Sequence, residues 1–119
     1  MTTLMVVDDE LNMARKLVQR LKEWGYPVVA QATSGTMAVV KARSIEMDAI
    51  IMDVELRSEM DGITAARSIT KDRDLPILFL GTKPIDAYSE RLNACGKYLY
   101  LDKHGDIDTI RESLESLLN

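Results

Sequence analysis

Three acidic residues and one lysine stand at or just beyond the ends of apolar runs, and together they could carry out phosphoryl chemistry. Asp8 and Asp9 follow "LMVV", Asp53 ends "DAIIMD", and Lys103 comes shortly after "KYLYL". Neighbouring carboxylates disfavour ionisation unless a cation compensates, and all-oxygen ligands suit a hard cation such as Mg²⁺. One carboxylate could then attack phosphorus while the metal screens the phosphoryl oxygens and Lys103 neutralises developing charge. Acids at strand ends are often solvated caps, but three acids and a lysine in such positions favour a site.

The elements that must position these residues alternate along the chain. Apolar runs predict strands at residues 4–7, 27–31, 48–53, 75–81 and 97–101. Helical spacing or start and stop signals predict helices at 11–24, 34–45, 62–71, 84–96 and 107–118. This alternation predicts an α/β fold, a doubly wound parallel sheet covered on both faces. Ligands of such sheets bind at the carboxyl ends of the strands, so we expect the acids to converge there.

Two helices also yield expectations about the core. The first should bury one face and end at Gly25; that face comprises Leu11, Ala14, Leu17, Val18, Leu21 and Trp24. The second should begin at a Ser34 cap, with Met37, Val40 and Ile45 pointing inward.

The composition limits the classes of protein to which the chain can belong. The chain has 119 residues, of which 46% are apolar and 29% charged, which predicts one globular domain over residues 1–119. A net charge of −4 argues against a nucleic-acid-binding surface. The single cysteine, Cys95, excludes an internal disulfide and fits a reducing cytosol. No apolar stretch approaches the roughly 20 residues that span a bilayer, and no signal peptide is recognisable. We therefore expect a cytoplasmic domain without a membrane segment.

The whole chain resembles the receiver domain of bacterial two-component response regulators. The resemblance rests on "MVVDDE", "DAIIMDVEL", "MDGITAAR", "LPILFL" and "CGKYLYLDK", in this order, with 50 residues from Asp53 to Lys103. It implies a flavodoxin-like sheet of five strands in the order 2-1-3-4-5 with five helices. It also implies a signalling switch, not an enzyme in its own right, that assists its own phosphorylation and dephosphorylation.

The resemblance assigns roles to particular residues. Asp53 would accept a phosphoryl group from a histidine kinase or a histidine phosphotransfer protein. Asp9 and Asp53 would ligate Mg²⁺, Asp8 would act mostly through a bound water, and the backbone carbonyl of Glu55 would be a further ligand. Lys103 would pair with the phosphoryl group.

Three positions depart from the family pattern. Arg57 stands where a proline is usual, in a loop one residue longer. His104 follows Lys103 in place of a proline with a cis bond, and a cis bond there would cost about 2.5–4 kcal/mol, so we expect trans. Gly81 occupies the slot of a serine or threonine. We hypothesise that Gly81 makes a local kink and that Thr82 supplies the missing hydroxyl; the competing possibility is that no hydroxyl contacts the phosphoryl group.

The sequence leaves two questions open: the role of Tyr100 on the output surface, and the class of function. The resemblance points to a switching face on helix four, strand five and helix five, which would meet an output domain or partner and carries Tyr88, Lys97, Tyr98 and Tyr100. Tyr100 is either a switch residue or plain strand packing. A receiver-like interaction domain that is not phosphorylated is the main alternative. An aspartyl-phosphate phosphatase fits less well, because Glu55 only loosely imitates its second acid and no cap segment is present.

Overall fold

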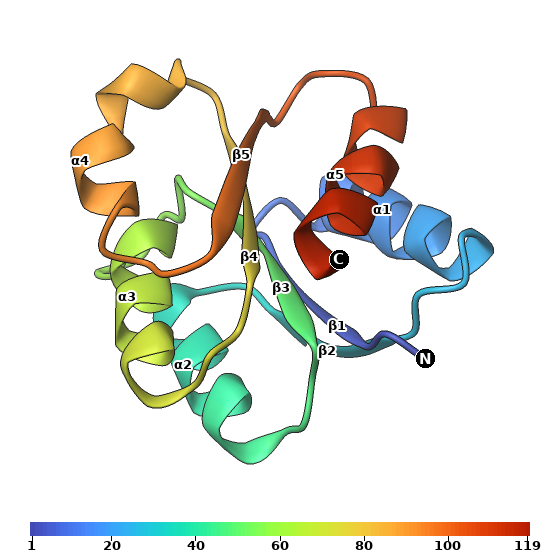
Figure 1. Cartoon of the computed structure of the whole chain (residues 1–119), viewed down its shortest axis with the longest axis horizontal. Coiled ribbons are helices and arrows are strands. Elements are labelled where there is room, and N and C mark those ends of the chain that lie inside the picture. The colour runs from blue at the N-terminus through green and yellow to red at the C-terminus, as the bar shows by residue number, and fades with distance from the viewer.

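Five parallel strands form the sheet that the alternating pattern predicts (Figure 1). The computed structural model describes residues 1–119. The strands are β1 (Leu4–Val7), β2 (Val28–Ala32), β3 (Ala49–Asp53), β4 (Ile77–Gly81) and β5 (Tyr98–Asp102). Their order is β2-β1-β3-β4-β5 and every neighbouring pair is parallel, which is the flavodoxin-like arrangement expected.

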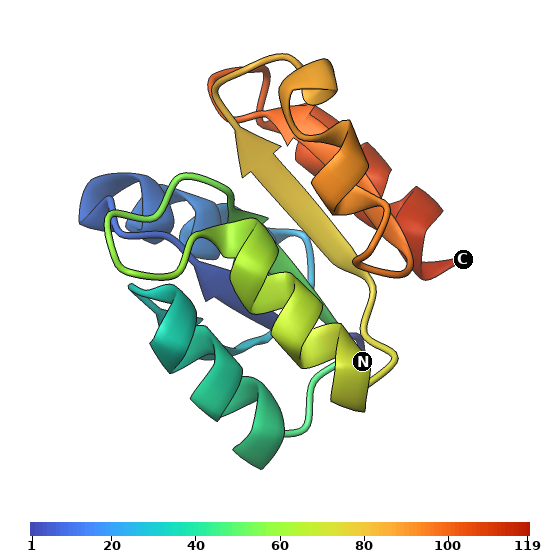
Figure 2. The ribbon, with the colours of Figure 1, turned by 90° about the vertical axis from the view of Figure 1, so that its left-hand side faces the viewer.

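Helices cover both faces of this sheet (Figures 1 and 2). They are α1 (Leu11–Glu23), α2 (Gly35–Ser44), α3 (Gly62–Asp72), the 3₁₀ turn η1 (Ile85–Ala87), α4 (Ser89–Leu92) and α5 (Asp108–Leu118). Helices α1 and α5 lie on one face, and α2, α3 and α4 lie on the other. None of them is long and apolar enough to cross a bilayer.

The three central strands are apolar, apart from Asp53 at the end of β3, because both of their sides are buried. In β3, Ile50 and Met52 enter the core beneath α2 and α3, while Ala49 and Ile51 enter the core beneath α1 and α5. The edge strands β2 and β5 are only partly buried. The prediction of a sheet covered on both faces is therefore confirmed, most clearly at the three central strands.

Helix α1 ends as expected and begins differently. Gly25 follows its C-cap at φ 90°, a left-handed conformation that other residues rarely adopt. Leu17 and Leu21 are buried as predicted. The inward placement of Leu11 is wrong, because its side chain is 63% exposed in the first turn.

Helix α2 shows that size, as well as spacing, decides which residues face the core. Ser34 caps it as predicted, its Oγ accepting the Met37 N–H at 3.1 Å. The inward placement of Met37 and Val40 is wrong, since they are 38% and 59% exposed, whereas Ile45 does pack against the core. The buried side consists of small residues that allow close approach to α3: Gly35, Ala38, Val39 and Ala42.

The segment expected as one helix over 84–96 is divided. The turn η1 and the four-residue α4 meet at Tyr88, whose φ of −125° is not helical. Tyr88 is buried and its hydroxyl bonds to Glu55 in the loop after β3. We attribute the break to this anchoring contact.

Adjacent valines test the corrected orientation of α2. Val39→Ala should lower the free energy of unfolding by about 1.5–3 kcal/mol, because it removes buried methyl groups and leaves a cavity. Val40→Ala, the matched control on the exposed side, should change it by less than about 0.5 kcal/mol. Urea unfolding measures both, and equal losses would contradict this orientation.

Candidate functional site: an acidic pocket at the carboxyl edge of the sheet

The parallel sheet brings the predicted lysine and acids together. Asp8 follows β1, Asp53 ends β3 and Lys103 follows β5, and these three are the only buried charged residues. Nζ of Lys103 lies 2.8 Å from Oδ2 of Asp53 and 3.3 Å from Oδ1 of Asp8. Hydrogen bonds between full charges are among the stronger ones. Lys103 thus joins the ends of three strands.

Glu10 is a fourth member that the sequence argument missed. Its Oε1 accepts from Nζ of Lys103 at 3.2 Å, and its backbone N–H donates to Oδ1 of Asp8 at 2.8 Å. The acidic run "DDE" was the only available signal, and nothing in it showed that its third residue turns back towards the lysine.

Asp9 completes the acid cluster from the rim. One carboxylate oxygen each of Asp8, Asp9 and Asp53 lie within 4.8 Å of one another. Octahedral Mg²⁺ binds oxygen ligands at about 2.1 Å, so neighbouring ligands lie about 3 Å apart and these carboxylates would move closer to one another around the ion. The donor set therefore fits a hard cation.

The charges in this pocket shift the pKa values of its members. Burial raises the pKa of Asp53 to about 6 against the opposing hydrogen bond and charge of Lys103, and the charge of Asp8 adds to the rise. Burial alone would lower the pKa of Lys103, but the hydrogen bond and charge of Asp53 outweigh it and raise that pKa. At Asp9 burial is likewise outweighed, and contacts from Arg57 hold its pKa below the usual range. At neutral pH Asp53 is therefore mostly ionised.

A second carboxylate network adjoins Asp53. The backbone N–H of Glu55 donates to Oδ1 of Asp53 at 3.3 Å. The Glu55 carboxylate accepts the Thr82 hydroxyl and the Tyr88 hydroxyl, each at 2.5 Å, and the Thr82 N–H at 3.0 Å. Burial opposes ionisation of Glu55, but these hydrogen bonds outweigh it and hold the pKa of Glu55 below its usual value. The Thr82 hydroxyl is thus held by Glu55.

Gly81 makes room for a tyrosine, and the expected kink is not found there. Gly81 lies within β4 and does not have a positive φ. A Cβ at this position would lie 2.8 Å from Cε2 of Tyr100 and still closer to its hydroxyl. That hydroxyl donates to the carbonyl oxygen of Lys83, and the ring packs 5.8 Å from that of Tyr88. The absent side chain thus allows Tyr100 to lie against the end of β4.

The backbone after Lys103 agrees with expectation. No peptide bond in the chain is cis, so the bond before His104 is trans as predicted. The N–H of Lys103 donates to the carbonyl oxygen of Gly81 at 2.8 Å, which fixes the lysine beside β4.

Gly62, at the start of α3, has no room for a side chain because a Cβ would strike the carbonyl oxygen of Asp53.

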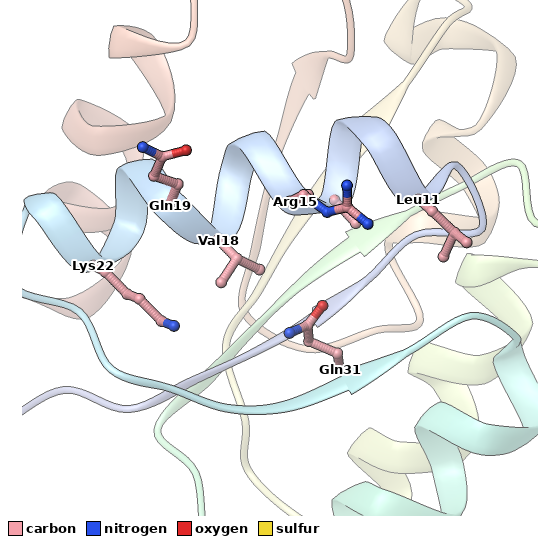
Figure 3. A pocket seen from close by; sticks show the side chains of 7 residues that line it. Leu11, Arg15, Val18, Gln19, Lys22 and Gln31 are labelled. Atoms are coloured by element: carbon pink, nitrogen blue, oxygen red, sulfur yellow. The ribbon is translucent and has the colours of Figure 1, made fainter.

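Two hollows differ in their chemistry. One of about 240 Å³ borders Asp8 and Lys103, between α1 and the loop before α5. Another, of about 420 Å³, lies between α1 and β2 (Figure 3). Its lining has no acidic or nucleophilic side chain: Leu11, Ala14, Arg15, Val18, Gln19, Lys22 and Gln31. Of these two hollows, only the smaller one borders the acid cluster.

The fold is thus flavodoxin-like, with three carboxylates and a buried lysine at the carboxyl edge of its sheet. The family model "Response regulator receiver domain" matches residues 4–115. The chain belongs to this family, whose members are signalling switches that interact with histidine kinases or phosphotransfer proteins and generally bind Mg²⁺ at the acidic site.

Named relatives and solved structures agree with this assignment. The transcriptional regulatory protein PdtaR of Mycobacterium tuberculosis is 32% identical over 94% of this chain and 54% of its own length. A protein-glutamate methylesterase/protein-glutamine glutaminase of Alkalilimnicola ehrlichii is 34% identical over 93% of this chain and 30% of its own length. The chain thus spans about a third to a half of these relatives.

Two solved structures show the same fold. The N-terminal domain of a response regulator/sensory box/GGDEF 3-domain protein from Carboxydothermus hydrogenoformans has a TM-score of 0.88 at 29% identity, covering 98% of this chain and 94% of that one. The receiver domain of sensor histidine kinase PA1611 from Pseudomonas aeruginosa has a TM-score of 0.85 at 26% identity, covering 98% and 97%. A magnesium ion is coordinated in the active site cleft of the latter.

The raised pKa of Asp53 predicts a pH-dependent stability. The folded-state pKa of about 6 exceeds the unfolded value of about 3.9, so the folded chain retains a proton that the unfolded chain releases. The stabilising contribution is complete below about pH 4 and is lost as the pH rises through about 6. Asp53→Asn, which cannot ionise, should therefore gain stability relative to the wild type between these values. Urea unfolding without Mg²⁺ measures this, and a difference that is constant or falls with pH would contradict the assignment.

Proposed function

We propose that this domain accepts a phosphoryl group on Asp53, with Mg²⁺ bound by the acid cluster. The observation that supports this most strongly is the 1% exposed Asp53 carboxylate, held by Lys103 at 2.8 Å and flanked by Asp8 and Asp9. A structural role alone gives no reason to gather three carboxylates around one lysine, because their mutual repulsion opposes it.

The proposed reaction is an in-line transfer to a carboxylate oxygen. An oxygen of Asp53 forms a bond to phosphorus while the P–N bond of a phosphohistidine breaks, and the electron pair stays on the donor's imidazole nitrogen. Lys103 neutralises charge on the phosphoryl oxygens as it develops, and the N–H of Glu55 helps orient the carboxylate. With a pKa of about 6, Asp53 is mostly ionised near pH 7.5 and can act as a nucleophile.

The metal would be held by this chain's own oxygens. Asp9 and Asp53 would ligate Mg²⁺ directly, Asp8 would act through a water, and the carbonyl of Glu55 would add a ligand. The bound ion would screen the negative charge between the carboxylates and the incoming phosphoryl group. Binding would also release Lys103 from part of its pairing with Asp8.

The donor would be a histidine kinase or a histidine phosphotransfer protein in the cytoplasm. The acceptor of the signal would be an output domain or partner that meets the face formed by α4, β5 and α5. The relatives carry out different activities as whole proteins, so the present domain's output is a separate question from its chemistry.

We propose that Glu55 couples Asp53 to that face. A phosphoryl group on Asp53 would place negative charge beside the Glu55 carboxylate, which the resulting repulsion would weaken as an acceptor. Thr82 could then donate its hydroxyl to a phosphoryl oxygen, and Tyr88 would lose its partner on Glu55. Because Tyr88 packs on Tyr100, the rearrangement would reach β5. The short α4 is suited to such movement because it makes few helical hydrogen bonds.

The alternative is an interaction domain that binds its partner without phosphorylation. The specific observation in its favour is that Tyr100 already lies against Gly81, so its position does not depend on a strand-four hydroxyl. The two functions differ in whether Asp53 is modified.

The first test is phosphorylation itself. Incubation with acetyl phosphate and Mg²⁺ should add one phosphoryl group, detected by intact mass, and Asp53→Asn should abolish the gain. Asp48→Asn is the matched control, because Asp48 accepts hydrogen bonds from Thr3 far from the pocket. A gain that persists in Asp53→Asn, or that is unaffected by a chelator, would rule out the proposal.

The second test addresses the coupling. In Thr82→Ala, phosphorylation should largely survive, while the NMR response of Tyr100 to beryllofluoride should shrink. Loss of one hydrogen bond to a charged oxygen would bias the switch by about ten- to a hundredfold. Thr36→Ala, at an exposed position on α2, is the control. An undiminished Tyr100 response in Thr82→Ala would remove Thr82 from the coupling path.

A further inference from the structure

The loop between β3 and α3 folds over the acid cluster and is attached to it through Arg57. The backbone N–H of Arg57 donates to Oδ2 of Asp9 at 2.7 Å, and its side-chain Nε lies 3.3 Å from the same oxygen. The Asp9 side chain is only 14% exposed, whereas that of Arg57 is 77% exposed. The loop therefore covers most of the Asp9 side chain, while the side chain of Arg57 extends into solvent.

The backbone contact depends on the residue type at position 57. A proline has no N–H and could not donate to Asp9. An arginine supplies both this donor and a guanidinium next to the carboxylate. Both contacts fall on Oδ2, and no hydrogen bond reaches Oδ1, which leaves that oxygen available to a cation.

The two contacts have opposite consequences for a metal. A neutral N–H that fixes one oxygen orients the carboxylate without adding charge, so it favours binding at the other oxygen. The guanidinium is a full positive charge beside the cluster, so it repels a divalent cation. Lys103 already contacts Asp8, Glu10 and Asp53, and Arg57 supplies the remaining positive charge at Asp9.

We propose that Arg57 is a positioning residue that sets the Mg²⁺ affinity of the pocket through these two opposing contacts. Its N–H holds Asp9 in place for the ion, and its side chain occupies the carboxylate until the ion arrives. The exposed side chain can leave without disturbing packing, so the exchange costs little. The inference rests on the proposed function, because the cation it concerns is the one that phosphorylation would use.

The experiment is a calorimetric titration of the intact 119-residue chain with Mg²⁺. Arg57→Ala keeps the N–H and removes the charge, so it should bind Mg²⁺ about two- to fivefold more tightly, the range an exposed ion pair allows. Arg57→Lys should return the affinity towards that of the wild type. The gain in Arg57→Ala should shrink at high salt, because screening weakens the guanidinium's repulsion.

Arg57→Pro separates the backbone contact from the charge. It removes both, so it should bind Mg²⁺ more weakly than Arg57→Ala. Arg43→Ala is the matched control for net charge, because Arg43 is exposed and pairs with Asp72 between α2 and α3. Thermal unfolding shows whether each variant is folded, and if the proline variant is not, the alanine and lysine variants still decide the role of the charge.

The outcomes separate the two proposals. Equal Mg²⁺ affinities for the wild type, Arg57→Ala and Arg43→Ala would overturn the role of the guanidinium. Equal affinities for folded Arg57→Pro and Arg57→Ala would overturn the role of the N–H. A wild-type chain that binds no Mg²⁺ would instead overturn the proposed function.

Discussion

The buried contact between Lys103 and Asp53 is the interaction on which the rest of the site depends. Both charges are removed from water, and each is stabilised by the other at 2.8 Å, with further contacts from Lys103 to Asp8 and Glu10. Removing Lys103 would leave the buried charge of Asp53 uncompensated, a change that typically costs about 3–5 kcal/mol. The parallel sheet supplies the geometry, because the ends of β1, β3 and β5 meet at one edge. One lysine cannot balance the surrounding carboxylates, so the pocket favours a further cation.

The loops around this pocket are attached to it by carboxylates rather than by apolar packing alone. Asp9 holds the loop after β3 through Arg57, and Glu55 holds the end of β4 and the region of α4 through Thr82 and Tyr88. A change of charge at Asp53 would therefore act on both attachments at once. In the proposed function, these attachments would carry a modification of Asp53 to the face formed by α4, β5 and α5.

The sequence was sufficient where periodicity and strand ends determine structure. Continuous apolar runs predicted the strands, and the residues after them predicted the convergence of Asp8, Asp53 and Lys103. Sequence patterns failed to predict the orientation or role of residues that is determined by contacts with distant parts of the chain. The hydrophobicity of Val40 predicted that it would face the core. Instead, the side of α2 that packs closely on α3 consists of smaller residues. The role of Gly81 depends on Tyr100, which arrives from another strand and leaves no local signal.

Mapping the modified residue tests the central claim most directly. After incubation with acetyl phosphate and Mg²⁺, borohydride reduces an acyl phosphate to an alcohol, which marks the acceptor carboxylate permanently. Peptide mass spectrometry then locates it. The Lys103–Asp53 geometry predicts a single reduced site at Asp53. A mark on Asp8, Asp9 or Glu55 instead, or none while Mg²⁺ is bound, would contradict the claim that this pocket makes Asp53 the phosphoryl acceptor.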